Sequence, residues 1–373
     1  MKKLILVIAA LALIASPAMA VDWNFYGSAR MATFYNTRDF NNGSASDLSG
    51  ASGDLKGNFD RDDEVQWDLQ GNSRLGATVK AENISGRFEF GINEPGRGGG
   101  DSDTVTSRRI FGEWDFGSAK LKVGKDYSPV KQFISGQAFG GDAGLLGNGT
   151  AYGGRNGQIG LSFGGFEIAA IQNKGGMLRN MDTGDVDNYV PRLEAGWGMS
   201  FDTWNFKLIG GFQYYSIDDG GAREKQVDVT SYLLGADAGV NFGPIYIKAG
   251  VSGGANWGNA GWSGSAAGAA FDGDDDTDDV DTYMGALIGG FKFTDQLTLE
   301  AGWGYQYNDS DAKDEDDTDT QAYYLQAVIS LAPGVWIIPE VGGYNYGSDL
   351  TAGGTGKDHG DQVYAGAKWQ IDF

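Results

Sequence analysis

The sequence predicts an all-β protein, a closed up-and-down antiparallel β-barrel of about sixteen strands that spans a membrane. Three observations support this prediction. Apolar and polar residues alternate with a period of two in runs that recur from residue 22 to residue 373. Tight turns and long polar loops join these runs in strict alternation. The chain also holds 62 Gly, 20 Phe, 17 Tyr and 10 Trp, which suits a sheet whose aromatic face meets something other than water.

Residues 1–20 have the pattern of a secretory signal peptide. Lys2 and Lys3 precede an apolar run at residues 4–14, and residues 18–20 read Ala-Met-Ala, a small-x-small cleavage site. The apolar run is too short to act as a membrane anchor. We therefore expect residues 1–20 to be cleaved and residues 21–373 to form one transmembrane barrel domain.

Composition excludes several other classes of protein. The formal net charge is −22, and loss of the two signal lysines makes it more negative, so a basic nucleic-acid-binding surface is not expected. Cysteine is absent, which excludes disulfides and thiolate chemistry. Abundant glycine argues against long helices. A secreted chain without disulfides can gain stability by closing a sheet on itself, which removes its edges.

The alternation gives the expected strands in order. They lie at residues 22–35, 64–82, 87–93, 110–116, 120–124, 158–163, 166–173, 192–201, 204–216, 230–242, 245–254, 282–293, 297–307, 321–331, 335–346 and 362–373. The short connections carry Gly, Pro, Asp and Asn, as hairpin turns need. Short periplasmic turns and long external loops are typical of an outer-membrane barrel, whereas a soluble sandwich has no reason to sort its loops by length.

The two faces of these strands differ as lipid and water would require. Candidate lipid-facing sets are Leu297, Leu299, Ala301, Trp303 and Tyr305, and Tyr323, Leu325, Ala327, Ile329 and Leu331. Interleaved positions are mostly Gly, Thr, Ser, Gln or charged. An aromatic-rich soluble barrel is the alternative reading.

The same alternation sorts the charged residues. A charge on the lipid face costs up to about 2–4 kcal/mol at the midplane, so charges are expected to face the lumen. The expected lumenal set is Arg30, Arg74, Lys80, Glu82, Arg87, Glu89, Arg109, Glu113, Asp115, Lys120, Lys122, Glu167, Arg192, Glu194, Lys207, Asp237, Lys248, Lys292, Glu300, Glu340 and Lys368.

Two stretches resemble a known family. The run IFGEWDFGSAKLKVGKDYSP, residues 110–129, resembles the fourth and fifth strands of the Gram-negative trimeric general porins. The matching positions are Gly112, Phe116, Gly117, Leu121, Val123, Gly124 and Lys125. Residues 365–373 resemble the closing strand of these porins. In that family the carboxy-terminal Phe, here Phe373, is an assembly signal read by the barrel-assembly machinery.

The resemblance implies a water-filled pore in the bacterial outer membrane, narrowed by a third loop that folds into the lumen. That loop is expected at residues 127–157. It also implies a homotrimer whose partners include outer-membrane lipid and lipopolysaccharide. The match is imperfect, because Asp142 is the one acid that follows Asp126 in this loop, and Ser107 stands where the family usually has Arg.

A constriction between a basic wall and an acidic loop would set ion preference through a transverse field. We expect Arg30, Arg74 and Arg109 to form the wall, with Asp142 opposite. The full candidate set is Arg30, Arg74, Arg109, Lys122, Lys131, Asp142 and Arg155. The alternative is that these are ordinary solvated or paired lumenal charges.

Two acidic runs, residues 271–282 and 308–320, fall in expected external loops. Asp272, Asp274 and Asp276 have the spacing of the start of an EF-hand. However, Thr277 replaces its glycine and Tyr283 its closing Glu. A solvated surface is the preferred interpretation, and loose binding of Ca²⁺ or bridging to lipopolysaccharide phosphates is the alternative. No resident cofactor is expected.

The leading functional hypothesis is passive diffusion of ions and small hydrophilic solutes. A substrate-specific sugar or anion channel and a structural or adhesive barrel without transport are the alternatives. An enzyme is not expected, because a Ser-His-Asp site would need the sole histidine, His359, in the last loop.

Overall fold

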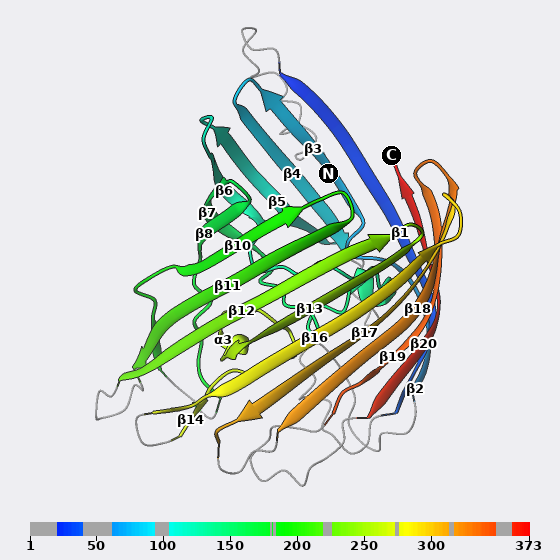
Figure 1. Cartoon of the computed structure of the whole chain (residues 1–373). Helices are drawn as coiled ribbons and strands as arrows, with labels where there is room; N and C mark the ends of the chain where they lie inside the picture. The colour runs from blue at the N-terminus through cyan, green and yellow to red at the C-terminus, as the bar shows by residue number, and fades with distance from the viewer. Residues whose placement is uncertain are drawn as a thin grey trace.

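The computed structural model describes residues 21–39, 62–93, 104–179, 181, 184–218, 226–272, 276–312, 317–347 and 360–373. Within these ranges the chain forms an 18-stranded antiparallel sheet that closes on itself (Figure 1). Closure follows from β1 (Asp22–Asp39), which pairs with β2 (Asp62–Leu69) and β3 (Arg74–Ala81) on one side and with β20 (Asp361–Asp372) on the other. No helix among the described residues is long and apolar enough to cross a bilayer.

The remaining strands of the sheet follow one another around the ring. They are β4 (Ile84–Asn93), β5 (Thr104–Asp115), β6 (Lys120–Tyr127), β7 (Arg155–Phe163), β8 (Phe166–Ile171), β9 (Asp185–Asp187), β10 (Arg192–Ser200), β11 (Trp204–Asp218), β12 (Gln226–Phe242), β13 (Ile245–Ala255), β16 (Val280–Lys292), β17 (Leu297–Ser310), β18 (Thr318–Ala332) and β19 (Val335–Asn345). Two four-residue helices, α2 (Phe139–Asp142) and α3 (Trp257–Ala260), and a small hairpin of β14 (Ala270–Phe271) and β15 (Thr277–Asp278) are not part of this sheet.

The ring has sixteen wall strands in the described part of the chain. β2 and β3 pair with successive halves of β1, and β9 and β10 pair with successive parts of β11, so each couple forms one wall strand. The predicted sixteen-stranded barrel is therefore confirmed. One expected strand, residues 64–82, is broken at residues 70–73.

Tight turns lie at one end of the barrel and long connections at the other (Figure 1). The turn between β7 and β8 shows why the sequence folds this way. Gly164 and Gly165 have φ angles of 52° and 84°, which a two-residue hairpin of type I′ needs and which side chains disfavour. The predicted alternation of short turns and long loops is confirmed.

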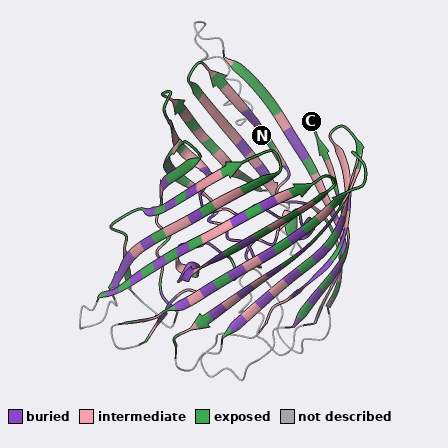
Figure 2. Cartoon of the chain, viewed as in Figure 1, coloured by how far each residue is buried: buried purple, intermediate pink, exposed green. Residues whose placement is uncertain are grey.

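Buried and exposed residues alternate along the strands (Figure 2), and the large exposed side chains of the wall are apolar, as alternation predicts. Leu299, Trp303, Tyr323, Leu325 and Leu331 are all exposed on the outside. Large apolar side chains exposed around the ring suit a hydrocarbon environment, and aromatic residues near strand ends suit its interfaces.

The buried core lies inside the barrel. Two segments fill part of the lumen: the third loop, residues 128–154, and an inner segment, residues 256–271. Val130, Leu145 and Ala151 of the third loop are completely buried, as are Trp257 and Trp262 of the inner segment. The expectation of an inward-folded third loop is confirmed.

Candidate functional site

Acidic residues on the wall strands β10, β17 and β19 hold the third loop inside the barrel. Glu340 on β19 accepts hydrogen bonds from the backbone N–H of Ala138 at 2.6 Å and of Phe139 at 3.0 Å. The Tyr364 hydroxyl donates to the same carboxylate at 2.9 Å. A carboxylate that accepts several N–H and O–H bonds satisfies loop donors that would otherwise be buried without partners.

Two further carboxylates act in the same way. Glu300 on β17 accepts from the N–H of Gly136 at 2.9 Å, and Glu194 on β10 accepts from the N–H of Val130 at 2.9 Å. All three acids were expected to face the lumen, and they do. Each is nonetheless buried under the third loop, so none presents its charge to a solute in the open passage.

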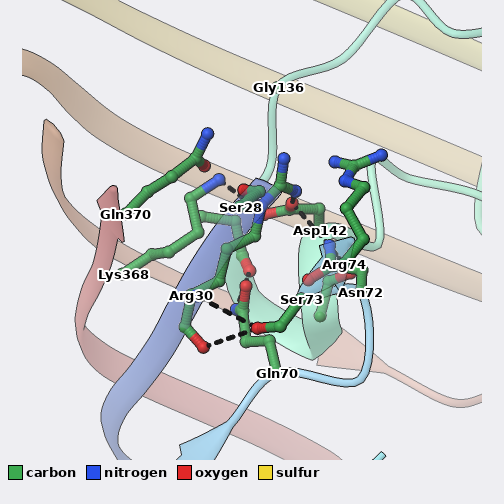
Figure 3. A network of polar contacts seen from close by, with 12 residues as sticks. Ser28, Arg30, Gln70, Asn72, Ser73, Arg74, Gly136, Asp142, Lys368 and Gln370 are labelled. Carbon is green, nitrogen blue, oxygen red and sulfur yellow. Dashed lines mark hydrogen bonds and ion pairs between the residues drawn. The ribbon is translucent and has the colours of Figure 1, made fainter. Parts of the chain in front are cut away.

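The tip of the third loop meets the seam where the barrel closes (Figure 3). Asp142 forms ion pairs with Arg30 on β1 and with Lys368 on β20, the latter at 2.6 Å between Nζ and Oδ1. Asn72 donates to the same carboxylate at 2.6 Å. Gly140, Gly141 and Asp142 all have positive φ angles of 63–74°, a backbone conformation that lets the tip turn tightly.

The break between β2 and β3 supplies part of this seam. Residues 70–73 leave the wall and contact the loop tip. Asn72 donates to the carbonyl of Gly141 at 2.9 Å, and Gln70 donates to the carbonyl of Ala138 at 3.3 Å. The N–H of Arg30 donates to Ser73 Oγ at 3.0 Å, so the break is tied to β1 as well.

A second cluster of cations lies farther around the wall. Arg108 Nε donates to Glu89 at 2.8 Å, and Arg74 approaches the same carboxylate at 3.8 Å. The register between β4 and β5 shifts at this point: Glu89 is opposite Arg109 and Phe90 is opposite Ser107. Arg108 therefore has no opposite residue on β4 and forms a bulge. A bulge of this kind turns Arg108 and Arg109 toward the lumen together.

Asp126 pairs with the next two cations. Arg109 Nε and Lys122 Nζ each contact its carboxylate at 2.6 Å. The Arg109 guanidinium also lies over the rings of Phe111 and Tyr127, 5.3 Å and 5.2 Å from their centroids, which fixes its position along the wall.

The remaining two candidate cations lie beyond this cluster. Lys131 contacts Glu167 on β8 at 2.8 Å, and Arg155 lies over Tyr127, 5.4 Å from the ring centroid. Tyr152 of the third loop packs nearby on Phe133, and burial raises the pKa of its hydroxyl. Tyr152 is therefore neutral near pH 7 and adds no negative charge.

At the clusters around Glu89 and Asp126, the positive charge is more accessible than the negative charge. The side chains of Glu89 and Asp126 are 2% exposed, whereas Arg74, Arg109 and Lys122 are 21%, 17% and 27% exposed. These two acids thus lie behind the cations that they pair with, whereas Asp142 at 24% and Glu167 at 49% are more exposed than Arg30 at 11% and Lys131 at 22%. Inner positions on β10–β18 are largely buried by the third loop and the inner segment. The accessible lumenal side chains lie mainly on β3–β8.

The residues predicted for the constriction fall into two groups in the structure. Arg30 contacts Asp142. Arg74 pairs with Glu89, Arg109 and Lys122 both pair with Asp126, and Lys131 pairs with Glu167. These cations form the wall beside the contact between Arg30 and Asp142.

Sequence reasoning missed Asn72, Arg108 and the role of Lys368. Alternation had placed Lys368 inward without linking it to Asp142. Gly71-Asn72 inside an expected strand and two consecutive arginines were the available signals for a break and a bulge.

Other predicted sites are only partly described. Asp272 and Asp276 are exposed, and the backbone N–H of Asp276 donates to Asp272 Oδ1 at 3.2 Å. Asp274 lies outside the described residues. No group of three potential metal ligands occurs within the ranges that the structure describes, so calcium binding stays a prediction. His359 and the signal peptide also lie outside these ranges. Phe373 points outward and pairs through its backbone with Gly27.

No protein-family model matches the chain, and no curated protein matches its sequence. Solved structures do match its fold. The outer membrane channel DcaP of Acinetobacter baumannii has a TM-score of 0.72 and 14% identity, covering 96% of this chain and 99% of that chain.

Two other solved structures are similar. For the anion-selective porin from Comamonas acidovorans the TM-score is 0.58 at 12% identity, with 95% and 100% coverage. For the trimer form of OmpT, an outer membrane protein of Vibrio cholerae, it is 0.56 at 16% identity, with 94% and 99% coverage. With sixteen strands, an inward third loop and an apolar exterior, the chain has the fold of the outer-membrane porins.

Proposed function

We propose that this protein is a passive diffusion channel in the bacterial outer membrane for ions and small hydrophilic solutes, with a preference for anions. The observation that carries the proposal is the unequal exposure of charge at the Glu89 and Asp126 clusters on β3–β6. Arg74, Arg109 and Lys122 reach the lumen, while their partners Glu89 and Asp126 lie buried behind them. A permeating ion therefore meets positive potential at this part of the wall.

Selection would arise from pore width and from this potential, and no reaction is part of the proposed function. The apolar exterior supports insertion into outer-membrane lipid, where lipopolysaccharide would surround the external loops. The porin fold supports a homotrimer inserted by the barrel-assembly machinery, with Phe373 as the signal. The acidic loops would hold divalent cations only loosely.

Reversal potentials of the purified protein in a planar bilayer test this proposal. Under a potassium chloride gradient, the sign of the zero-current potential should correspond to chloride crossing faster than potassium. A bilayer without stepwise conductance would refute the channel. A potential of the opposite sign would refute the anion preference while leaving the channel intact.

A further inference from the structure

We propose that the inner segment, residues 256–271, is a second constriction element that supports the third loop and limits the width of the passage. Trp262 is its positioning residue. This inference rests on the proposed channel function and adds to it an element that alternation of residues does not reveal. Figure 1 shows α3, at the start of this segment, lying within the ring of strands.

The inner segment is attached to the inner wall by both of its tryptophans. Trp257 Nε1 donates to the carbonyl of Tyr232 on β12 at 3.1 Å. Trp262 Nε1 donates to Glu194 Oε1 on β10 at 2.9 Å. Both side chains are completely buried. Burying two indoles with their N–H groups paired stabilises this segment strongly against the wall.

Hydrogen bonds join the inner segment to the third loop. The N–H of Tyr152 donates to the carbonyl of Trp262 at 2.8 Å, and Ser265 Oγ donates to the carbonyl of Gly147. Glu194 holds both at once, because its Oε2 accepts the N–H of Val130 while its Oε1 accepts the indole of Trp262. The third loop thus rests on the inner segment as well as on the wall.

The wall is shaped to receive Trp262. An added Cβ at Gly211 on β11 would overlap the Trp262 ring. At the neighbouring Gly210, an added Cβ would meet Leu234 Cδ2 at 3.4 Å, an ordinary van der Waals contact. Glycine is therefore required at Gly211 to seat the indole, while Gly210 tolerates a methyl group.

Loss of the Trp262 contact should widen the passage. The third loop and the inner segment together cover the inner face of the barrel from β10 to β18. Without the indole, Glu194 no longer fixes the position of the Trp262 backbone carbonyl, which accepts from the N–H of Tyr152, and the third loop can move away from the cations of β3–β6. The open passage would then be broader and less uniform.

Single-channel recordings of two matched pairs test the inference. Gly211→Ala displaces Trp262 and Gly210→Ala is its control, since both place one methyl group on β11. Trp262→Ala removes the indole, and Trp303→Ala, which removes an exposed indole from the outer surface, is its control. We expect Trp262→Ala to show higher conductance and additional open levels. Gly211→Ala pushes the indole off the wall into the lumen and should show lower conductance, and both controls should match the wild type.

The outcomes separate this inference from the proposed function. If the wild type conducts and either folded test variant conducts as it does, or changes conductance in the opposite direction, the inference is wrong and the channel function stands. If Trp262→Ala fails to fold, Gly211→Ala decides the question, with Gly210→Ala showing that an added methyl on β11 is accepted. A wild-type protein that gives no conductance refutes the channel function, and the inference fails with it.

Discussion

Lys368 on the last strand and Asp142 in the third loop form an ion pair of 2.6 Å although 226 residues separate them. The pair lies at the seam between β1 and β20, where Ala32 of β1 is in register with Lys368. Arg30 contacts the same carboxylate. The third loop is therefore fastened to the strands that close the barrel, so closure and constriction depend on one another.

Asp142→Asn should strengthen the anion preference. The substitution removes the negative charge between Arg30 and Lys368 and retains the size of the side chain. One unit charge at about 8 Å in water, screened over one Debye length, changes the energy of each ion by about 0.2 kcal/mol, with opposite signs for anion and cation, so the anion-to-cation permeability ratio should rise about twofold. Zero-current potentials measure the ratio. Asp115→Asn, at the turn end of β5, is the control and should leave it unchanged.

Arg109→Gln should weaken the anion preference by a similar factor, about twofold, because it removes an accessible positive charge and frees part of the Asp126 charge. The same zero-current measurement applies. Lys120→Gln, which neutralises an exposed cation at the turn end, is the matched control. An unchanged ratio in Arg109→Gln would place Arg109 away from the narrow part of the passage.

Glu340→Ala should loosen the third loop. The backbone N–H groups of Ala138 and Phe139 would lose their acceptor, at a cost of about 1–3 kcal/mol for each buried donor left unsatisfied. Current recordings should show frequent fluctuations in the open level. Glu113→Ala, which removes a lumenal carboxylate without loop contacts among the described residues, should remain quiet. Quiet recordings from both variants would mean that Glu340 does not anchor the loop.

Gly304→Ala should narrow the passage. An added Cβ at Gly304 on β17 would overlap the carbonyl of Asn148 and force the third loop away from the wall into the lumen. Single-channel conductance should fall. Gly289→Ala on the neighbouring β16 is the control, because an added Cβ there meets nothing within 4 Å. Equal conductance in the two variants would show that the loop adapts without entering the passage.

The barrel could be predicted from the sequence because its strands and turns depend on residues that are close together in the chain. Each strand alternates between lipid and lumen, so period two and turn chemistry define it, as at Gly164 and Gly165. The strand predicted at residues 64–82 failed at residues 70–73. That break is stabilised by contacts of Asn72 and Gln70 with the third loop, and such contacts do not appear in the alternation.

The site was less predictable because tertiary contacts decide it. Alternation places Arg109 inward and Arg108 outward, but the bulge opposite Glu89 turns both into the lumen. The inner segment has a Gly-rich composition typical of an exposed loop. Two tryptophans within six residues were the signal that it is buried, and the lumenal Glu194 was the signal for its anchor.

The most direct test of the account is the zero-current potential of the wild-type protein in a planar bilayer that separates unequal concentrations of potassium chloride. We expect stepwise conductance and a potential whose sign shows that chloride permeates faster than potassium. A potential of the opposite sign would contradict the assigned charge of the passage, and a silent bilayer would contradict the open passage itself.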